Sequence, residues 1–185
     1  MLKSILHNQI AAQVERPFGY DAAYMHELVD ADPATAIRFS LVTGLVARKA
    51  APPEALAAAG LVGTLAEDCG PCTQISVEIA TRGGVKPEVL RAILAGDEAA
   101  MGASAALAYR FSRASLARDM DAADPLRDEV VRRWGKKGLV ALALALTTAR
   151  MYPTMKYAMG HGRACSRVMV AGEPAPFHAP LPAAA

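Results

Sequence analysis

The spacing of apolar residues constrains this chain more than any other feature. Apolar side chains recur at intervals of three and four residues, as in Leu139, Leu142 and Leu146, or in Leu107 and Phe111. Residues at this spacing lie on one face of an α-helix, whereas a half-buried strand alternates at every second residue. No stretch of the sequence alternates convincingly in that way. We therefore expect an all-α protein, built as a single-domain helical bundle.

Proline and glycine positions divide this pattern into separate helices. Proline lacks a backbone N–H and fits the first turn of a helix, while glycine is common just past the last turn. Asp32, Asp97 and Asp124 stand where a carboxylate can cap the next helix, and Pro153 is expected to interrupt the helix before it. The predicted helices cover residues 2–14, 21–29, 33–49, 54–66, 69–83, 87–94, 97–119, 124–134 and 136–150, with a last one ending near residue 170.

Length, charge and cysteine count limit the remaining organisation. A chain of 185 residues suits one all-helical domain over residues 1–171, followed by a proline-rich tail over 172–185 that cannot be helical. The net charge of +2 provides no basic face for nucleic acid. The longest apolar run, residues 139–149, is far shorter than the ~20 residues that span a bilayer. Three cysteines, an odd number, fit a reducing compartment. We expect a cytoplasmic protein with no membrane or nucleic-acid partner.

The most distinctive stretch is Cys69-Gly70-Pro71-Cys72, which runs directly into a helical pattern. Pro71 fits only the first turn of a helix, so the helix begins at about Cys69 or Gly70. Cys69 then lies near unsatisfied N–H groups and the positive end of the helix dipole, which favour a thiolate. Cys72 follows over the same face, so the two sulfurs can form a small disulfide ring. A thiolate with a resolving partner predicts reversible thiol–disulfide chemistry.

Two other interpretations of the cysteines stay open. Both can be ordinary buried core residues, or they can be half of a zinc site. His161 lies between two glycines and four residues before Cys165, so these two residues would complete a Cys₃His zinc set with Cys69 and Cys72. The proline between the cysteines, and the lack of a second Cys-x-x-Cys pair in the sequence, favour redox chemistry.

Several features around the motif together resemble the carboxymuconolactone decarboxylase / alkylhydroperoxidase D superfamily. They are Cys69-Gly70-Pro71-Cys72 after an Ala-rich helix, the glycine stop at 83–84, and the short helix that opens with Pro87-Glu88-Val89-Leu90. Residues 105–113 and 139–151 look like the long helices that follow in that family, so the resemblance covers about residues 50–160. It implies an all-α fold of the alkylhydroperoxidase D-like type, usually a homo-oligomer, with no bound organic cofactor.

The redox branch of that superfamily uses its two cysteines for peroxide reduction or disulfide exchange. Its pattern is Glu, eleven residues, Cys-x-x-Cys, three residues, His, and in it the second cysteine becomes a sulfenic acid that the first resolves. Cys69 and Cys72 match the two cysteines, but the Glu position falls on Ala57 and the His position on Ser76. Both proton-relay residues of the family are therefore replaced in this chain.

Three residues are candidates for the missing proton-transfer groups. Ser76, one helical turn beyond Cys72, could hydrogen-bond a thiolate or simply pack against a neighbouring helix. Glu67 could accept a proton, although acids near a helix start more often balance the dipole. His161 could fold back as a base. The expected catalytic residues are therefore Cys69, Cys72, Glu67, Ser76 and His161.

The sequence predicts an alkylhydroperoxidase-like oxidoreductase. One thiolate attacks a peroxide or disulfide substrate, the other closes a disulfide, and an external thiol reductant reopens it. The alternative is a non-redox scaffold of the same kind that binds a small acidic ligand and has structural cysteines.

Overall fold

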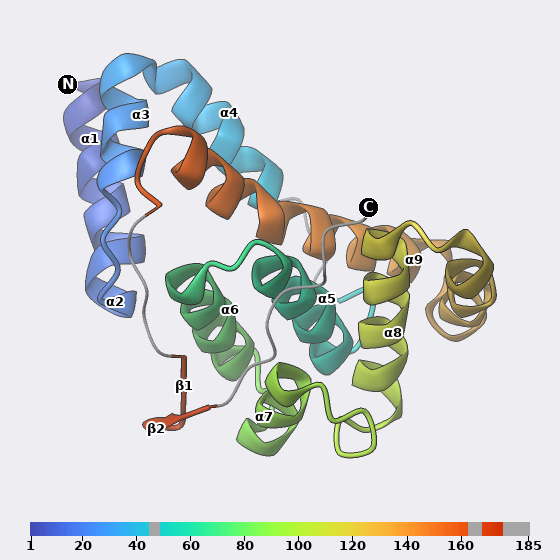
Figure 1. Ribbon diagram of the computed structural model, residues 1–185. Helices are drawn as coiled ribbons and strands as arrows, with labels where there is room; N and C mark the ends of the chain where they lie inside the picture. The colour runs from blue at the N-terminus through green and yellow to red at the C-terminus, as the bar shows by residue number, and fades with distance from the viewer. Residues whose placement is uncertain (45–48, 163–167, 176–185) are drawn as a thin grey trace.

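The computed structural model describes residues 1–44, 49–162 and 168–175, and most of these residues are helical (Figure 1). The predicted all-α class is confirmed, because the sole sheet within those ranges is a pair of two-residue strands. The elements are, in order, α1 (Leu2–Ile10), the π-helical η1 (Ala11–Glu15), α2 (Arg16–Phe18), α3 (Ala23–Ala31), α4 (Pro33–Gly44), α5 (Pro53–Ala66), α6 (Gly70–Arg82), α7 (Pro87–Ala95), α8 (Ala103–Ala117), α9 (Met120–Ala158), β1 (Met169–Val170) and β2 (Glu173–Pro174).

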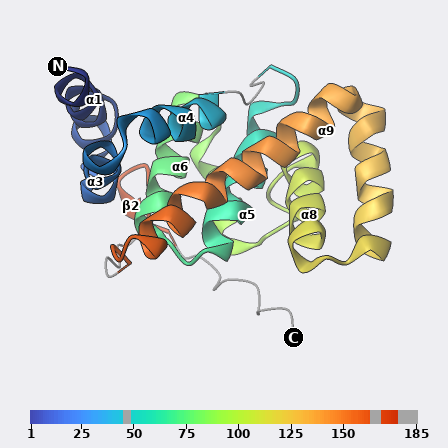
Figure 2. The same cartoon turned by 90° about the horizontal axis from the view of Figure 1, so that it is seen from above.

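Helix α5 lies at the centre of the larger of two packed clusters. Figures 1 and 2 show it between α6 and α8, with α9 running across it. Its buried face is rich in alanine, including Ala55, Ala58 and Ala59, and such small side chains let the neighbouring helices approach closely. The approach is tight at Gly63, where a Cβ would lie 2.7 Å from the Leu146 carbonyl oxygen of α9. Because the cysteine motif follows the C-terminal end of α5, this packing positions it.

The N-terminal helices form a second buried cluster beside the first. Ile10 of α1, Tyr24 of α3 and Ala36 of α4 belong to it. Ile75 of α6 and Met155 of α9 pack against the same cluster. Figure 1 accordingly shows α1, α3 and α4 beside the C-terminal part of α9. The N-terminal layer is thus joined to the two helices that surround the cysteines.

The chain from residue 120 to 158 confirms one predicted helix boundary and contradicts another. The predicted break at residue 135 is present, because α9 consists of two helical segments that meet in a kink at Gly135, whose backbone is not helical (φ 68°, ψ 179°). Helix α9 starts earlier than predicted. Its capping residue is Asp119, whose carboxylate accepts the Ala122 N–H at 3.0 Å, and not the predicted Asp124. Despite its length, neither α9 nor any other described helix has an apolar stretch long enough to cross a membrane.

Pro153 does not interrupt α9, contrary to the prediction. It is buried within the helix, so tertiary packing maintains the helical backbone in spite of the missing N–H. The prediction of a last helix ending near residue 170 is also wrong, because α9 ends at Ala158 and Gly160 takes a left-handed conformation (φ 84°). His161 therefore lies beyond the end of α9, while Cys165, its predicted partner on one helix face, lies outside the described residues.

Helix α8 begins at Ala103, six residues later than predicted. The carboxylate of Asp97 instead accepts the Ala100 N–H at 3.3 Å and closes a local turn. Gly102, in a left-handed conformation (φ 76°), then precedes the helix. Because glycine adopts such a backbone without steric cost, the turn continues up to it and the helix starts after it.

Residues 172–175, which the sequence assigns to the tail, are part of the packed structure. The guanidinium of Arg91 in α7 donates to the Val170 carbonyl oxygen at 2.7 Å and to the Glu173 carboxylate at 3.1 Å. Ala175 is buried, and its N–H donates to the Val168 carbonyl oxygen at 2.9 Å. The rest of the predicted tail, 176–185, lies outside the described residues.

Candidate redox site at the start of helix α6

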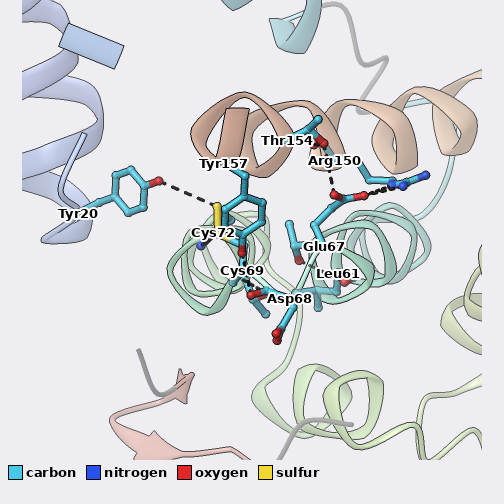
Figure 3. Close-up of a disulfide and its surroundings, with 11 residues drawn as sticks. Tyr20, Leu61, Glu67, Asp68, Cys69, Cys72, Arg150, Thr154 and Tyr157 are labelled. Atoms are coloured by element: carbon cyan, nitrogen blue, oxygen red, sulfur yellow. Dashed lines mark hydrogen bonds and ion pairs between the residues drawn. A yellow bond between two sulfur atoms is a disulfide. The ribbon is translucent and has the colours of Figure 1, made fainter. Parts of the chain in front are cut away.

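Cys69 and Cys72 form a disulfide at the N-terminus of α6 (Figure 3). Cys69 is the capping residue of the helix, and its sulfur accepts the Cys72 backbone N–H at 3.3 Å. Pro71 occupies the first turn, as predicted, where its missing N–H has no helical partner to lose. The two Cα atoms are 5.3 Å apart, within the usual range for a disulfide. The motif therefore holds both sulfurs within bonding distance at the positive end of the helix dipole.

The loop before Cys69 is held by hydrogen bonds from two helices. Asp68 has a left-handed backbone (φ 48°), and its carbonyl oxygen accepts the Tyr157 hydroxyl of α9 at 2.9 Å. The Cys69 carbonyl oxygen accepts both the Thr73 N–H at 2.8 Å and the Thr73 hydroxyl at 3.0 Å. Figure 3 shows Tyr157 reaching down from α9 to this loop. These contacts fix the turn that presents Cys69 to the helix N-terminus.

Both sulfurs are shielded from solvent. Cys69 is 2% exposed and Cys72 is 6% exposed. Burial in a purely apolar environment would raise a thiol pKa and make both cysteines inert. The chemistry open to this pair therefore depends on the polar groups that face the sulfurs.

Tyr20 is the polar residue that faces Cys72. Its hydroxyl oxygen lies 4.0 Å from the Cys72 sulfur, and Figure 3 shows the side chain extending from the N-terminal layer toward α6. Burial raises the pKa of Tyr20 to about 12, and a hydrogen bond with Tyr24 opposes this in part. Tyr20 therefore keeps its proton at neutral pH and can act there as a hydrogen-bond donor.

Lys156 of α9 lies beside the aromatic ring of Tyr20. The residue is only 5% exposed, and its Nζ atom is 5.5 Å from the centroid of the Tyr20 ring. Burial lowers the pKa of Lys156, while the negative charge of Asp21 acts in the opposite direction. Among the described residues, no carboxylate lies close enough to form a salt bridge with this ammonium. A cation is thus held next to the tyrosine that faces Cys72.

Sequence reasoning does not identify Tyr20 and Lys156 as parts of this site. Their side chains come from segments far from the motif, since Tyr20 precedes Cys72 by 52 residues. A buried lysine in an otherwise apolar helical pattern is the one local signal, because lysine is almost never fully buried without a partner.

Glu67 points toward α9 and away from the sulfurs. Its carboxylate forms an ion pair with Arg150 at 2.5 Å and accepts the Thr154 hydroxyl at 3.3 Å (Figure 3). This arrangement ties the end of α5 to α9. It places the carboxylate in a structural ion pair, with no hydrogen bond to either cysteine among the described residues.

Ser76 and Ala57 occupy the two positions where the resemblance places proton-relay residues. Ser76 is half-buried on α6, and its hydroxyl has no hydrogen-bond partner within the described ranges. Ala57 is half-buried on α5 and packs against the core. Neither residue supplies an acid or base near the disulfide.

His161 is engaged elsewhere. Its Nε2 atom lies 2.8 Å from the Glu27 carboxylate, and its ring is tilted beside Tyr24 with centroids 6.4 Å apart. Among the described residues it makes no hydrogen bond to either cysteine, and no three His, Cys, Asp or Glu side chains converge to hold a metal ion. Cys165, the remaining member of the predicted zinc set, lies outside the described residues.

The fold and the site together define a class: a mostly helical protein with a Cys-x-x-Cys disulfide at the N-terminus of a helix. Comparisons of the chain with protein-family models, with curated proteins and with solved structures find no match. The resemblance to the carboxymuconolactone decarboxylase / alkylhydroperoxidase D superfamily therefore stays a prediction from the sequence.

Proposed function

We propose that this protein is a thiol-dependent oxidoreductase whose reacting groups are Cys69 and Cys72. The observation that carries the proposal is the disulfide between a helix-capping cysteine and the residue three positions on. When the disulfide is reduced, the Cys72 N–H and the helix dipole remain directed at the Cys69 sulfur. Both stabilise a thiolate, the form of cysteine that attacks peroxides and disulfides.

A purely structural role for this disulfide is disfavoured by the length of its loop. A disulfide stabilises a fold mainly by restricting the unfolded chain, and closing a loop of only four residues contributes about 2 kcal/mol in that model. A disulfide that closes a longer loop contributes more stability. The same four residues are already fixed by Pro71 and by the hydrogen bonds from Thr73. The disulfide therefore adds little to the stability of the fold, whereas its position at a helix N-terminus suits reversible reduction.

The reaction balances with an external thiol of the small-molecule or protein class. A thiolate of the reductant attacks one sulfur of the disulfide, the sulfur–sulfur bond breaks, and the second cysteine leaves as a thiolate. A second thiol of the reductant resolves the mixed disulfide, so the protein gains two electrons and two protons while the reductant becomes a disulfide. Re-oxidation by a peroxide consumes the two electrons and yields an alcohol and water, through a sulfenic acid on the attacking cysteine.

The test begins with a Cys165→Ser variant, so that the motif holds the remaining two thiols of the chain. This protein is equilibrated in thiol–disulfide buffers of graded potential, then alkylated and mapped by mass spectrometry. We expect one two-electron transition, a mass loss of two protons on oxidation, and alkylation of a reduced cysteine well below the pH of about 8.5 at which free cysteine titrates. Hydrogen peroxide or an organic hydroperoxide should restore the disulfide within the time of the assay.

A different result would overturn the proposal. If the disulfide resists reduction until the protein unfolds, the bond is structural. If both reduced thiols react with alkylating reagent only near the ordinary cysteine pKa, the site lacks a reactive thiolate. In either case the non-redox scaffold of the sequence analysis becomes the better description.

A further inference from the structure

Tyr20 lies beside the Cys72 sulfur of the buried disulfide, and Lys156 lies beside Tyr20. The Tyr20 hydroxyl lies 4.0 Å from the Cys72 sulfur, and the Lys156 ammonium lies 5.5 Å from the centroid of the Tyr20 ring. A neutral disulfide gains little from either a hydroxyl donor or a cation. Each of them becomes favourable when the neighbouring sulfur carries a negative charge.

We propose that Tyr20 donates a hydrogen bond to the Cys72 thiolate in the reduced protein, and that Lys156 stabilises this arrangement as a positioning residue behind the tyrosine ring. This inference rests on the proposed redox function and names the groups that act on one of its two sulfurs. Tyr20 acts whenever Cys72 is charged, either as the leaving sulfur during reduction or as an attacking thiolate during oxidation. It donates a hydrogen bond and keeps its proton.

The chemistry of Tyr20 agrees with that role. Its burial raises its pKa to about 12, so the hydroxyl does not ionise near neutral pH and cannot serve as a base there. The ring holds the Lys156 ammonium over one face, an arrangement in which a cation is attracted to the aromatic quadrupole. The positive charge next to the ring in turn favours negative charge on a neighbouring group.

The other charged groups around the cluster leave this effect in place. Glu67, the carboxylate that begins the loop, is neutralised by Arg150 and directed toward α9. Asp21 interacts with Lys156 from the N-terminal layer, but it is exposed to solvent and makes no salt bridge with it. Among the described groups, a hydrogen-bond donor (Tyr20) and a cation (Lys156) therefore dominate the electrostatic environment near Cys72.

The two sulfurs are stabilised by different parts of the molecule. Cys69 receives the Cys72 backbone N–H, a contact that is local to α6. Cys72 receives a side chain from the N-terminal layer, which contacts α6 by packing and through Arg82, whose guanidinium donates to the Pro17 carbonyl oxygen at 3.1 Å. Removal of the Tyr20 hydroxyl should therefore affect Cys72 and leave the titration of Cys69 nearly unchanged.

The test isolates Cys72 as a single thiol. In a Cys69→Ser, Cys165→Ser protein the serine keeps an oxygen at the helix cap, so the start of α6 is preserved. The alkylation rate of Cys72 is measured as a function of pH in this protein and in the same protein carrying Tyr20→Phe. The midpoint of each curve gives the pH at which the Cys72 thiolate forms. We expect Tyr20→Phe to raise the midpoint by about one pH unit, a tenfold loss of thiolate at a fixed pH below it. Lys156→Met should shift it in the same direction by a smaller amount.

Matched controls separate this effect from a general loss of packing. Tyr109→Phe removes another buried hydroxyl, one that accepts a hydrogen bond from Arg113 at 2.9 Å on α8 and does not contact the disulfide. Lys137→Met removes an exposed charge from α9. Both should leave the Cys72 midpoint where it is, while circular dichroism verifies that each variant is folded.

The reduction potential gives a second readout in the Cys165→Ser protein, where the disulfide can form. A stabilised Cys72 thiolate favours the reduced state, so Tyr20→Phe should lower the potential by about 30 mV for a tenfold change. If the disulfide cycles but Tyr20→Phe leaves both the midpoint and the potential at the values of Tyr109→Phe, the inference is wrong and the proposed function stands. If the disulfide does not cycle with Tyr20 present, the proposed function itself fails.

Discussion

The close approach of α5 to α9 allows a sharp test of how the cysteine motif is positioned. Gly63 lies on the α5 face that meets α9, and a Cβ at this position would lie 2.7 Å from the Leu146 carbonyl oxygen and 3.0 Å from the Ala149 Cβ. Both are rigid parts of a helix. Gly60, one turn earlier on the same helix, has no atom within 4 Å of its Cβ position. The two glycines therefore differ in environment while sharing a helix.

Replacing each glycine by alanine is expected to change the free energy of unfolding in opposite directions. Replacing a helix-interior glycine by alanine gains roughly 0.5–1 kcal/mol of stability through backbone entropy. At Gly60 nothing opposes that gain, so Gly60→Ala should stabilise the protein by about this amount. At Gly63 the new methyl group displaces α9, and overpacking of a rigid interface costs about 1–3 kcal/mol. Because the contact is with backbone, we expect the upper part of that range and a net destabilisation of about 1–2 kcal/mol.

The assay is urea denaturation of both variants and of the unmodified chain, with the disulfide oxidised in each. The urea midpoints should fall in the order Gly60→Ala, unmodified, Gly63→Ala, and the free energies of unfolding of the two variants should differ by about 1.5–3 kcal/mol. In thermal unfolding this corresponds to roughly 3–12 °C for a chain of this size. If Gly63→Ala is as stable as Gly60→Ala, α5 and α9 do not pack as closely as the structure has them, and this packing does not position the cysteine motif.

Two further predictions concern the surroundings of the disulfide. Glu67→Gln should lower the free energy of unfolding by no more than about 1 kcal/mol at low salt, because the Arg150 partner is partly exposed. The variant should leave the rate of thiol alkylation unchanged. A large loss of thiol reactivity would instead support Glu67 as a proton acceptor. Because the pKa of Tyr20 is raised to about 12 from 10.0, the unfolded chain releases this proton first as pH rises, so stability should fall between pH 10 and 12. Denaturation midpoints across that range should decline less steeply for Tyr20→Phe, and equal slopes would contradict the buried environment of this hydroxyl.

The starts of α4 and α6 were predictable because the signals for them are local. Asp32 caps α4 as predicted, since its carboxylate accepts the Ala34 and Thr35 N–H groups at 3.0 and 3.2 Å. The Cys69 cap of α6 follows in the same way from Pro71 two residues later. In each case the residues that decide the structure lie within three positions of one another, and one sequence contains all the information needed.

Features that depend on packing between distant segments were not predictable in this way. Pro153 ends a helix by every local rule, yet it is buried inside α9 because the surrounding helices hold the backbone. Asp124 followed by Pro125 is a good start by local rules, yet α9 begins earlier, at Met120, with Asp119 as its cap. The same limit applies to the site, where the sequence supplies both cysteines but not the Tyr20 side chain that faces one of them.

The surroundings of the disulfide distinguish a redox pair from a structural one more clearly than the motif does. A disulfide that only joins two residues is best served by apolar neighbours, because a buried hydroxyl or ammonium without a strong partner costs free energy. Here the Cys69 sulfur faces an N–H group, and the Cys72 sulfur faces the Tyr20 hydroxyl with Lys156 behind it. These hydrogen-bond donors and this cation stabilise a neutral disulfide only weakly, whereas they stabilise a negatively charged thiolate strongly. This environment is compatible with the reduced protein and so supports the proposed redox function.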